Sequence, residues 1–309
     1  MIPTVRKFTT ALAFLAGALM LAGAPARADD VTVKHAQGET AVPQNPAKVL
    51  VFDLGALDIL DRLGVAVAGV PGGVKPSYLN KYDADGYAKI GTLFEPDYEA
   101  VNAAEPDLIV VGGRSAAKYG ELSRIAPTID LTGDAKDFIG SVERNVETLG
   151  RVFGKEAEAA AEVGKLDASV AALKQKTAGK GKGLLILTTG GKISAYGPGS
   201  RFGVLHDALG VEPAAPDLSI GNHGQPASFE LILETNPDWL FVIDRDAAIG
   251  REGQSAQQLL DNELVRQTTA WQKGQVVYLD PANWYLVGGG LTGLHQSIDQ
   301  IEQAFDKAP

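Results

Sequence analysis

The sequence contains no cysteine among its 309 residues. It can therefore form no disulfide bond, hold no thiolate-ligated metal, and carry no lipid attached to a cysteine. It also lacks an excess of positive charge, because 28 Lys and Arg stand against 38 Asp and Glu, a net charge of −10. This balance argues against a nucleic-acid partner and against an anionic membrane surface. A local group of arginines is for the same reason more notable than it would be in a basic protein.

Only one long apolar run is present, and it lies at the start of the sequence. Arg6 and Lys7 precede an apolar stretch over residues 8–24, and Ala26-Arg27-Ala28 then gives the small-x-small pattern of a secretory cleavage site. The run is short for a membrane-spanning helix. The pattern predicts that residues 1–28 are a cleaved signal peptide and that the product is a soluble protein of the periplasm. Removing them leaves 25 Lys and Arg (28 minus 3) against 38 Asp and Glu, a net charge of −13.

A repeated pattern organises the rest of the sequence. Residues 95–114 and 226–245 match at a constant offset of 131 (245 minus 114). Each copy reads as a short helix, stopped by Glu-Pro or Asn-Pro, followed by a buried strand that leads to Arg114 or Arg245. The repeat predicts two lobes of similar design. Ligands of open α/β sheets bind beyond the carboxyl ends of the strands, so two facing lobes would bring both arginines to one cleft.

Strands and helices alternate through both halves of the sequence. The apolar runs that read as strands are residues 31–33, 49–52, 65–70, 108–111, 125–131, 184–187, 240–243 and 276–279. Helices are expected over 56–63, 138–150 and 155–177, and a glycine-dense loop over 190–203 precedes a short helix over 204–209. We expect an α/β protein with a largely parallel sheet in each of two Rossmann-like lobes. The first lobe would be 29–154 and the second 179–309, joined by a long connecting helix over 155–178 that allows only small closure.

Four segments carry a resemblance to a known family. They are VFDLGALD at residues 51–58, GKISAYGPGSR at 191–201, FVIDR at 241–245, and YLDP with WYL between 278 and 286. The chain resembles the periplasmic binding proteins of ABC importers for ferric siderophores, in the catecholate (enterochelin) branch. The resemblance extends over essentially all residues after 28, and its Gly-Pro-Gly-Ser-Arg and Trp-Tyr-Leu elements are fairly specific. It implies a class III binding protein with two α/β lobes, a connecting helix, and a shallow cleft that holds an iron chelate.

The resemblance implies ligand-binding roles for Arg114, Arg201 and Arg245. A ferric catecholate is anionic and flat-faced, and a guanidinium group can both hydrogen-bond its oxygens and lie against its rings. Each arginine could instead be an ordinary surface residue, although the matched positions of Arg114 and Arg245 favour the ligand role. Lys118 is either a further cation of the site or a surface lysine. Trp284, beside the site, is expected to report occupancy through its fluorescence.

His223 and Tyr285 are the candidate metal ligands. A tetradentate siderophore leaves two positions open on octahedral Fe(III), and an imidazole nitrogen and a phenolate oxygen can fill them. The resemblance matches these two residues to a histidine and a tyrosine that do so. A plain hydrogen-bonding role is the alternative, and with a hexadentate siderophore neither residue need touch iron.

Glu99 and Glu230 lie in the first turns of the two matched helices. A carboxylate there is stabilised by the helix dipole, which alone explains its presence. The resemblance implies a second role, in which each glutamate pairs with arginines of the inner-membrane permease, so that their separation encodes docking. Glu95 could substitute for Glu99.

Other functions fit the sequence less well. A heme or cobalamin carrier is the first alternative, but heme needs an axial ligand in an apolar pocket, and three arginines argue against that. A secreted hydrolase could use Ser200, His223 and Asp244, but no Gly-x-Ser-x-Gly motif occurs. Residues 288–293 satisfy G-x-G-x-x-G without the strand and acidic residue of a dinucleotide site. We therefore expect a monomer without catalytic activity or intrinsic cofactor, whose partners are a ferric siderophore and an ABC permease with its ATPase.

Overall fold

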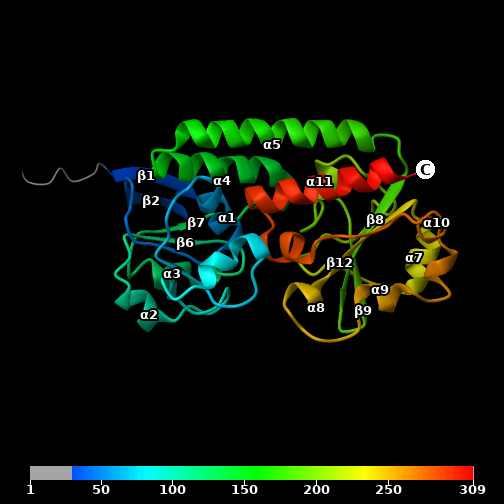
Figure 1. The fold of residues 1–309 in the computed structure, drawn as a ribbon, viewed down its shortest axis with the longest axis horizontal. Coiled ribbons are helices and arrows are strands. Elements are labelled where there is room, and N and C mark those ends of the chain that lie inside the picture. Colours follow the sequence, from blue (N-terminus) through cyan, green and yellow to red (C-terminus); the bar gives the residue numbers. More distant parts are fainter. Residues whose placement is uncertain (1–29, 309) are drawn as a thin grey trace, which may run out of the picture.

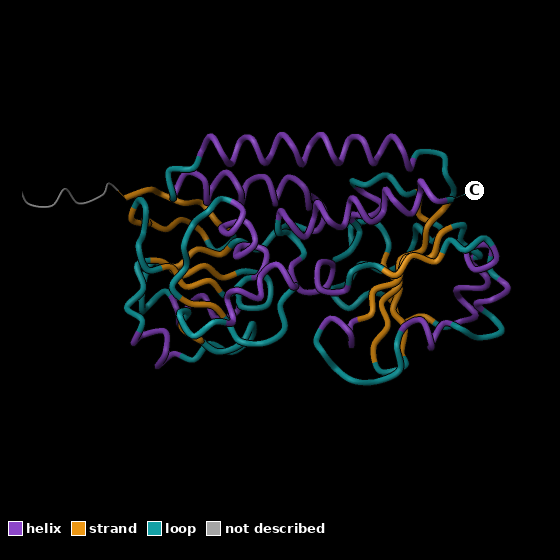
Figure 2. Tube along the Cα trace, viewed as in Figure 1, coloured by secondary structure: helices purple, strands orange, loops and turns teal. Residues whose placement is uncertain are grey.

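The structure, a computed structural model, describes residues 30–308, and the expected signal peptide over 1–28 lies outside this range. Two groups of strands lie apart along the long axis of the molecule, and long helices run along one side of both (Figures 1 and 2). We call the part built on the sheet β5-β4-β3-β6-β7 the first lobe, and the part built on β11-β9-β8-β12-β13 the second lobe. The α/β class expected from the sequence is confirmed.

The first lobe contains a fully parallel five-stranded sheet. A separate antiparallel pair, β1 and β2, lies beside it. Its elements are β1 (Asp30–His35), β2 (Gly38–Pro43), β3 (Val49–Val51), α1 (Leu54–Arg62), β4 (Gly69–Val70), η1 (Ser77–Asp83), β5 (Ala88–Lys89), α2 (Tyr98–Ala103), β6 (Leu108–Val111), η2 (Ala116–Lys118), α3 (Tyr119–Leu122), β7 (Thr128–Asp130), η3 (Ala135–Asp137) and α4 (Phe138–Val152).

The second lobe combines parallel and antiparallel pairings. Strands β10, β12 and β13 run parallel to β8, whereas β9 is antiparallel to β8 and β11 to β9. The elements after α4 are α5 (Glu156–Thr177), β8 (Lys182–Thr189), β9 (Lys192–Tyr196), α6 (Val204–Asp207), β10 (Glu212–Pro213), β11 (Gln225–Ala227), α7 (Phe229–Thr235), β12 (Trp239–Asp244), α8 (Arg245–Ala248), α9 (Ala256–Leu260), η4 (Val265–Gln267), α10 (Thr269–Gln272), β13 (Val276–Tyr278), the π-helix η5 (Ala282–Val287) and α11 (Leu291–Lys307).

Strand β9 corrects the expectation of a loop over residues 190–203. Residues 192–196 alternate, with Ile193 and Ala195 buried, so they pair with β8. Gly190 and Gly191 both have positive φ, 54° and 76°, which is what a two-residue hairpin turn requires. The glycines that indicated a loop are therefore the turn of a hairpin.

Two expected strands are much shorter than their apolar runs. Residues 65–70 give only β4, at Gly69–Val70, and residues 125–131 give β7, at Thr128–Asp130. Residues 65–67 run from the end of α1 to the sheet, where the Val65 N–H still donates to the carbonyl of Leu60 at 2.9 Å. Apolar character over these residues reflects packing beneath α1, and pairing begins only where the chain reaches β3.

A continuous apolar core joins the lobes. On β6 and β8 alternate residues face opposite sides, so Val110 and Leu187 belong to one core cluster while Ile109 and Ile186 pack in separate outer clusters. The shared cluster includes Leu166 of α5 and residues of both sheets. Helix α5, 22 residues and roughly 33 Å long, packs on α4 and on α11 and runs along both lobes (Figure 1). The division at 154 and 178 stays a prediction.

The chain crosses between the lobes a second time, which the sequence did not predict. After β13 it forms η5, which contacts α1 and α8, and then α11, which contacts α1 and α5. Within residues 30–308, none of the helices combines the length and apolar character that crossing a bilayer requires.

Candidate ligand-binding site

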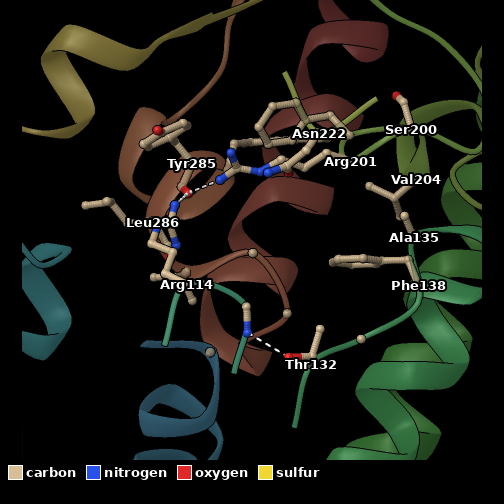
Figure 3. A pocket seen from close by; sticks show the side chains of 18 of the residues that line it. Arg114, Thr132, Ala135, Phe138, Ser200, Arg201, Val204, Asn222, Tyr285 and Leu286 are labelled. Carbon is tan, nitrogen blue, oxygen red and sulfur yellow. Dashed lines mark hydrogen bonds between the residues drawn. The ribbon is translucent and has the colours of Figure 1, made fainter. Parts of the chain in front are cut away.

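A cavity of about 1050 Å³ lies between the lobes. Its walls come from the loops after β3, β6 and β7 in the first lobe and after β8, β9 and β12 in the second, together with η5. At one side η3 approaches α6, where Ala135 and Phe138 lie near Val204 (Figure 3). The carboxyl ends of β3, β6 and β7 in the first lobe and of β8 and β12 in the second therefore open onto one space, as the repeat predicts for β6 and β12.

Tyr285 of η5 lies among three arginines of this cavity. The guanidinium carbons of Arg201, Arg114 and Arg245 lie 4.6, 5.2 and 5.5 Å from the centroid of its ring. Arg114 follows β6 of the first lobe, and Arg245 follows β12 of the second at the matched position. Cations over an aromatic face are attracted by its electron density. The two lobes thus bring their arginines together on one tyrosine.

Two of these arginines also hold the backbone of η5. The carbonyl oxygen of Tyr285 accepts a hydrogen bond from Arg114 Nη2 and one of 3.0 Å from Arg201 Nη2. Arg114 Nη1 donates to the carbonyl of Leu286 at 3.2 Å. Figure 3 shows the two side chains reaching this carbonyl from different sides. Carbonyls in the last turn of a helix lack intrahelical partners, so the arginines satisfy them.

Arg245 contacts the other end of the same tyrosine. Its Nε donates to Tyr285 Oη at 2.8 Å, and its Nη1 donates to Thr189 Oγ1 at 3.1 Å. Burial raises the pKa of Tyr285, but the hydrogen bond from Arg245 and the positive charges of Arg245, Arg201 and Arg114 together hold that pKa below its usual value. The site stabilises the phenolate form of Tyr285 relative to that of a tyrosine in water.

The cavity is positively charged although the protein is acidic. Its charged lining residues are the three arginines and Asp53, which gives a net +2 in a chain of net charge −10. Asp53 is the N-cap of α1, where its carboxylate accepts from the N–H of Ala56 at 2.9 Å. Burial raises the pKa of Asp53, while its hydrogen bonds and Arg114 lower it. A concave positive surface of this kind attracts anions.

His223 and Trp284 also line the cavity, and Lys118 does not. His223 is exposed in the loop before β11, whose Ser219 N–H donates to Gln225 Oε1 at 3.0 Å. Trp284 is 6% exposed and lies next to Tyr285 in η5. Lys118 pairs instead with Glu95 at 2.8 Å and is not itself a lining residue. Six of the site residues expected from the sequence therefore line one cavity: Arg114, Arg201, His223, Arg245, Trp284 and Tyr285.

Glu99 and Glu230 lie where the repeat predicts. Both are exposed in the first turns of α2 and α7, whose N-caps are Asp97 and Ser228. The pKa of Glu230 is lowered because its own backbone N–H and the Ser228 hydroxyl donate to its carboxylate. Helices α2 and α7 lie far apart, on different lobes (Figure 1).

Several lining residues were missed. Asp53 had a local signal, because Asp before an apolar helix is a common N-cap. Phe94, Thr132 and Ile220 had none, since they reach the cavity through loops whose path depends on the rest of the fold. Across residues 30–308, no three His, Asp or Glu side chains cluster in a way that could hold a metal ion.

The candidates for a hydrolytic triad have other partners. Ser200 is buried and its hydroxyl donates to the carbonyl of Gly197 at 2.6 Å. Asp244 accepts from the backbone N–H groups of Ala247 and Ala256 at 3.1 and 2.8 Å. These contacts give both side chains a structural role.

Comparison with known proteins decides the family. A family model described as periplasmic binding protein matches residues 49–282. The chain belongs to the periplasmic binding protein family.

Relatives of this periplasmic binding protein cover almost its full length. It is 45% identical to the petrobactin-binding protein YclQ of Bacillus subtilis over 92% of this chain and 91% of the relative. It is 33% identical to the ferric-anguibactin-binding protein FatB of Vibrio anguillarum over 89% and 87% of the two chains. The crystal structure of YclQ superposes with a TM-score of 0.88, at 44% identity over 90% and 99% of the chains. That of the catecholate-siderophore binding protein VctP of Vibrio cholerae gives 0.85, at 35% identity over 89% and 100%. The class III fold is thereby established.

Proposed function

We propose that this protein captures a ferric siderophore of the catecholate type in the cavity between its lobes. It would deliver this cargo to an inner-membrane ABC permease and its ATPase. The observation that carries the proposal is the convergence of Arg114, Arg201 and Arg245 on Tyr285 in a cavity of about 1050 Å³. The names of YclQ, FatB and VctP support it. The protein would act as a monomer in the periplasm and would catalyse no reaction.

The chemistry of the cavity fits a large anionic chelate. Its volume lies at the upper end of the roughly 300–1,000 Å³ that is usual for small-molecule sites. Guanidinium groups hydrogen-bond catecholate oxygens and lie flat against aromatic rings, which an ammonium group does less well. The same charges disfavour heme, whose apolar face would displace their hydration without supplying an equivalent number of acceptors.

We infer further that Tyr285 and His223 can complete the coordination of Fe(III). The lowered pKa of Tyr285 supports the first role, because the phenolate is the form that binds a hard cation. The exposed position of His223 on the cavity wall supports the second. Both roles apply only to a siderophore that leaves coordination positions open.

Titration of the tryptophan fluorescence with ferric siderophores tests the function, because Trp284 lines the cavity. We expect saturable quenching by a ferric catecholate, and weaker binding by Arg201→Ala and Arg245→Ala, with Arg251→Ala as the control for an exposed arginine outside the cavity. Binding of no ferric chelate by the wild type, together with hydrolysis of an ester, would favour the hydrolase alternative instead.

Replacing His223 tests its role as an iron ligand. His223→Ala should shift the visible charge-transfer band of a tetradentate ferric catecholate complex and leave that of a hexadentate complex nearly unchanged, because only the former has open positions. Visible spectra of both complexes with wild type and variant provide the measurement. Equal effects on the two complexes would exclude direct ligation, and His206→Ala, which replaces a histidine outside the cavity lining, is a control.

A further inference from the structure

Two exposed apolar side chains face the cavity from opposite lobes. Among residues 30–308, the large apolar side chains that are more than a third exposed are Val74 (44%), Phe94 (56%), Tyr98 (37%) and Ile220 (64%). Phe94 of the first lobe and Ile220 of the second both line the cavity, and the other two do not. Small-molecule sites are lined mainly by apolar and aromatic side chains, so these two side chains are placed to contact a ligand in the cavity.

The turn that carries Phe94 is fixed by hydrogen bonds. Thr92 Oγ1 accepts from the N–H groups of Phe94 and Glu95 at 3.3 and 3.0 Å, and the Thr92 N–H donates to the Glu95 carbonyl at 2.9 Å. The Glu95 carboxylate pairs with Lys118 at 2.8 Å. Gly91, at φ +108°, closes the turn where a Cβ would lie only 2.4 Å from the Glu95 carbonyl oxygen. The turn therefore holds Phe94 at its tip. Lys118 helps to fix the turn through its ion pair with Glu95.

Ile220 is held over the loop that carries Arg201. Its Cδ1 lies 3.4 Å from the point where a Cβ of Gly199 would stand. The backbone N–H of the preceding residue, Ser219, donates to Gln225 Oε1. Ile220, three residues before His223, thus lies against Gly199 of the Gly-Pro-Gly-Ser-Arg turn.

We propose that Phe94 and Ile220 form an apolar rim that selects chelates with an aromatic or aliphatic outer surface over small polar ferric chelates. This inference rests on the proposed function and specifies its substrate class. The arginines attract any anionic iron chelate and so discriminate poorly among them. Contact of the rim with apolar parts of the ligand adds binding energy that a compact polar chelate cannot gain.

Binding of two anionic chelates to rim variants tests the proposal. The probes are the ferric complex of a tris-catecholate and ferric citrate, titrated into wild type, Phe94→Ala, Ile220→Ala and the double variant. Each single variant should bind the catecholate about tenfold more weakly, equal to about 1.4 kcal/mol, and ferric citrate no more than about twofold more weakly. Phe94→Leu should retain most of the affinity, because it keeps an apolar side chain at the tip. Tyr98→Ala, outside the cavity, is the matched control.

The outcomes separate this inference from the function on which it rests. Unchanged binding of the catecholate by both single variants, or equal losses for the two chelates, would overturn the rim while leaving siderophore capture intact. A wild type that prefers ferric citrate would also overturn it. Binding of neither chelate by the wild type would remove the proposed function and the rim with it.

Discussion

At the scale of single residues, Tyr285 is held at both of its ends. Arg114 and Arg201 donate to its carbonyl oxygen, and Arg245 donates to its phenol oxygen. The arginines therefore do two things: they position η5, and they supply the charge that lowers the pKa of Tyr285. Arg114, whose Nη1 and Nη2 both reach η5 carbonyls, is the most committed of the three to the positioning role.

Removing Arg245 should raise the pKa of Tyr285. The hydrogen bond from Arg245 is the largest of the causes that lower this pKa. Without it, the pKa-raising effect of burial is offset less. A smaller fraction of Tyr285 should therefore be ionised at a given alkaline pH in Arg245→Ala. The measurement is tyrosinate absorbance against pH, as the difference between each protein and its Tyr285→Phe counterpart. Arg251→Ala is the control, and the same titration in all three backgrounds would contradict the coupling.

The repeat in the sequence located two of these arginines, because strand ends in matched lobes must face the same cleft. The hydrogen bonds to the η5 carbonyls could not be predicted. They depend on backbone atoms, which leave no trace in residue type, and they join residues 171 and 172 positions apart in the sequence.

At the scale of elements, α11 begins without a capping side chain of its own. Its N-cap is Gly290, and the carboxylate of Asp58 in α1 accepts instead from the N–H groups of Thr292 and Gly293, both at 2.9 Å. Tyr78 Oη donates to the same carboxylate at 2.9 Å. A Cβ on Gly290 would lie 2.4 Å from Asp58 Oδ2, which explains part of the glycine-rich run without any dinucleotide.

Asp58→Asn should destabilise the protein. An amide offers one acceptor oxygen where the carboxylate offers two, so one buried donor loses its partner and the free energy of unfolding falls by about 1–3 kcal/mol. Urea denaturation followed by circular dichroism measures the change. Asp299→Asn, at an exposed position of α11, should change the stability by less than about 0.5 kcal/mol, and equal effects of the two substitutions would contradict the cap.

The helices and the hairpin show which elements a sequence can predict. Helix α5 was predicted to within a residue at each end, because apolar residues recur at steps of three and four from Val163 to Leu173. Strand β9 was missed, because local glycine density outweighed a short alternation. The Asp58 cap joins residues 234 and 235 positions apart, so no local pattern could indicate it.

At the scale of the whole molecule, the shared core and the two crossings resist large motions of one lobe relative to the other. Helix α5 is tied to α11 by Lys176, which pairs with Glu302 at 2.6 Å and with Asp306 at 2.8 Å. A nearly rigid frame would keep Glu99 and Glu230 at a fixed separation, which supports the proposal that the two residues dock to a permease together.

Charge reversal at both glutamates should abolish uptake and spare binding. We propose that each glutamate pairs with arginines of the permease. In Glu99→Lys/Glu230→Lys those arginines would meet like charges, whereas the cavity is untouched. The measurements are uptake of radiolabelled iron by cells that depend on this protein and affinity in solution, which should stay within about twofold of wild type. Glu121→Lys/Glu263→Lys carries the same change of charge at exposed positions of α3 and the segment before η4. Equal uptake by Glu99→Lys/Glu230→Lys and by Glu121→Lys/Glu263→Lys would contradict the docking role.

The cap on α11 also governs the order in which the protein can mature. Asp58 is synthesised more than two hundred residues before Thr292 and Gly293, whose backbone N–H groups donate to its carboxylate. Until α11 is synthesised, the face of α1 that carries Asp58 has no α11 to cover it, so the amino-terminal half cannot reach its final packing alone. The two lobes therefore reach their native state together, and refolding experiments should find one cooperative transition.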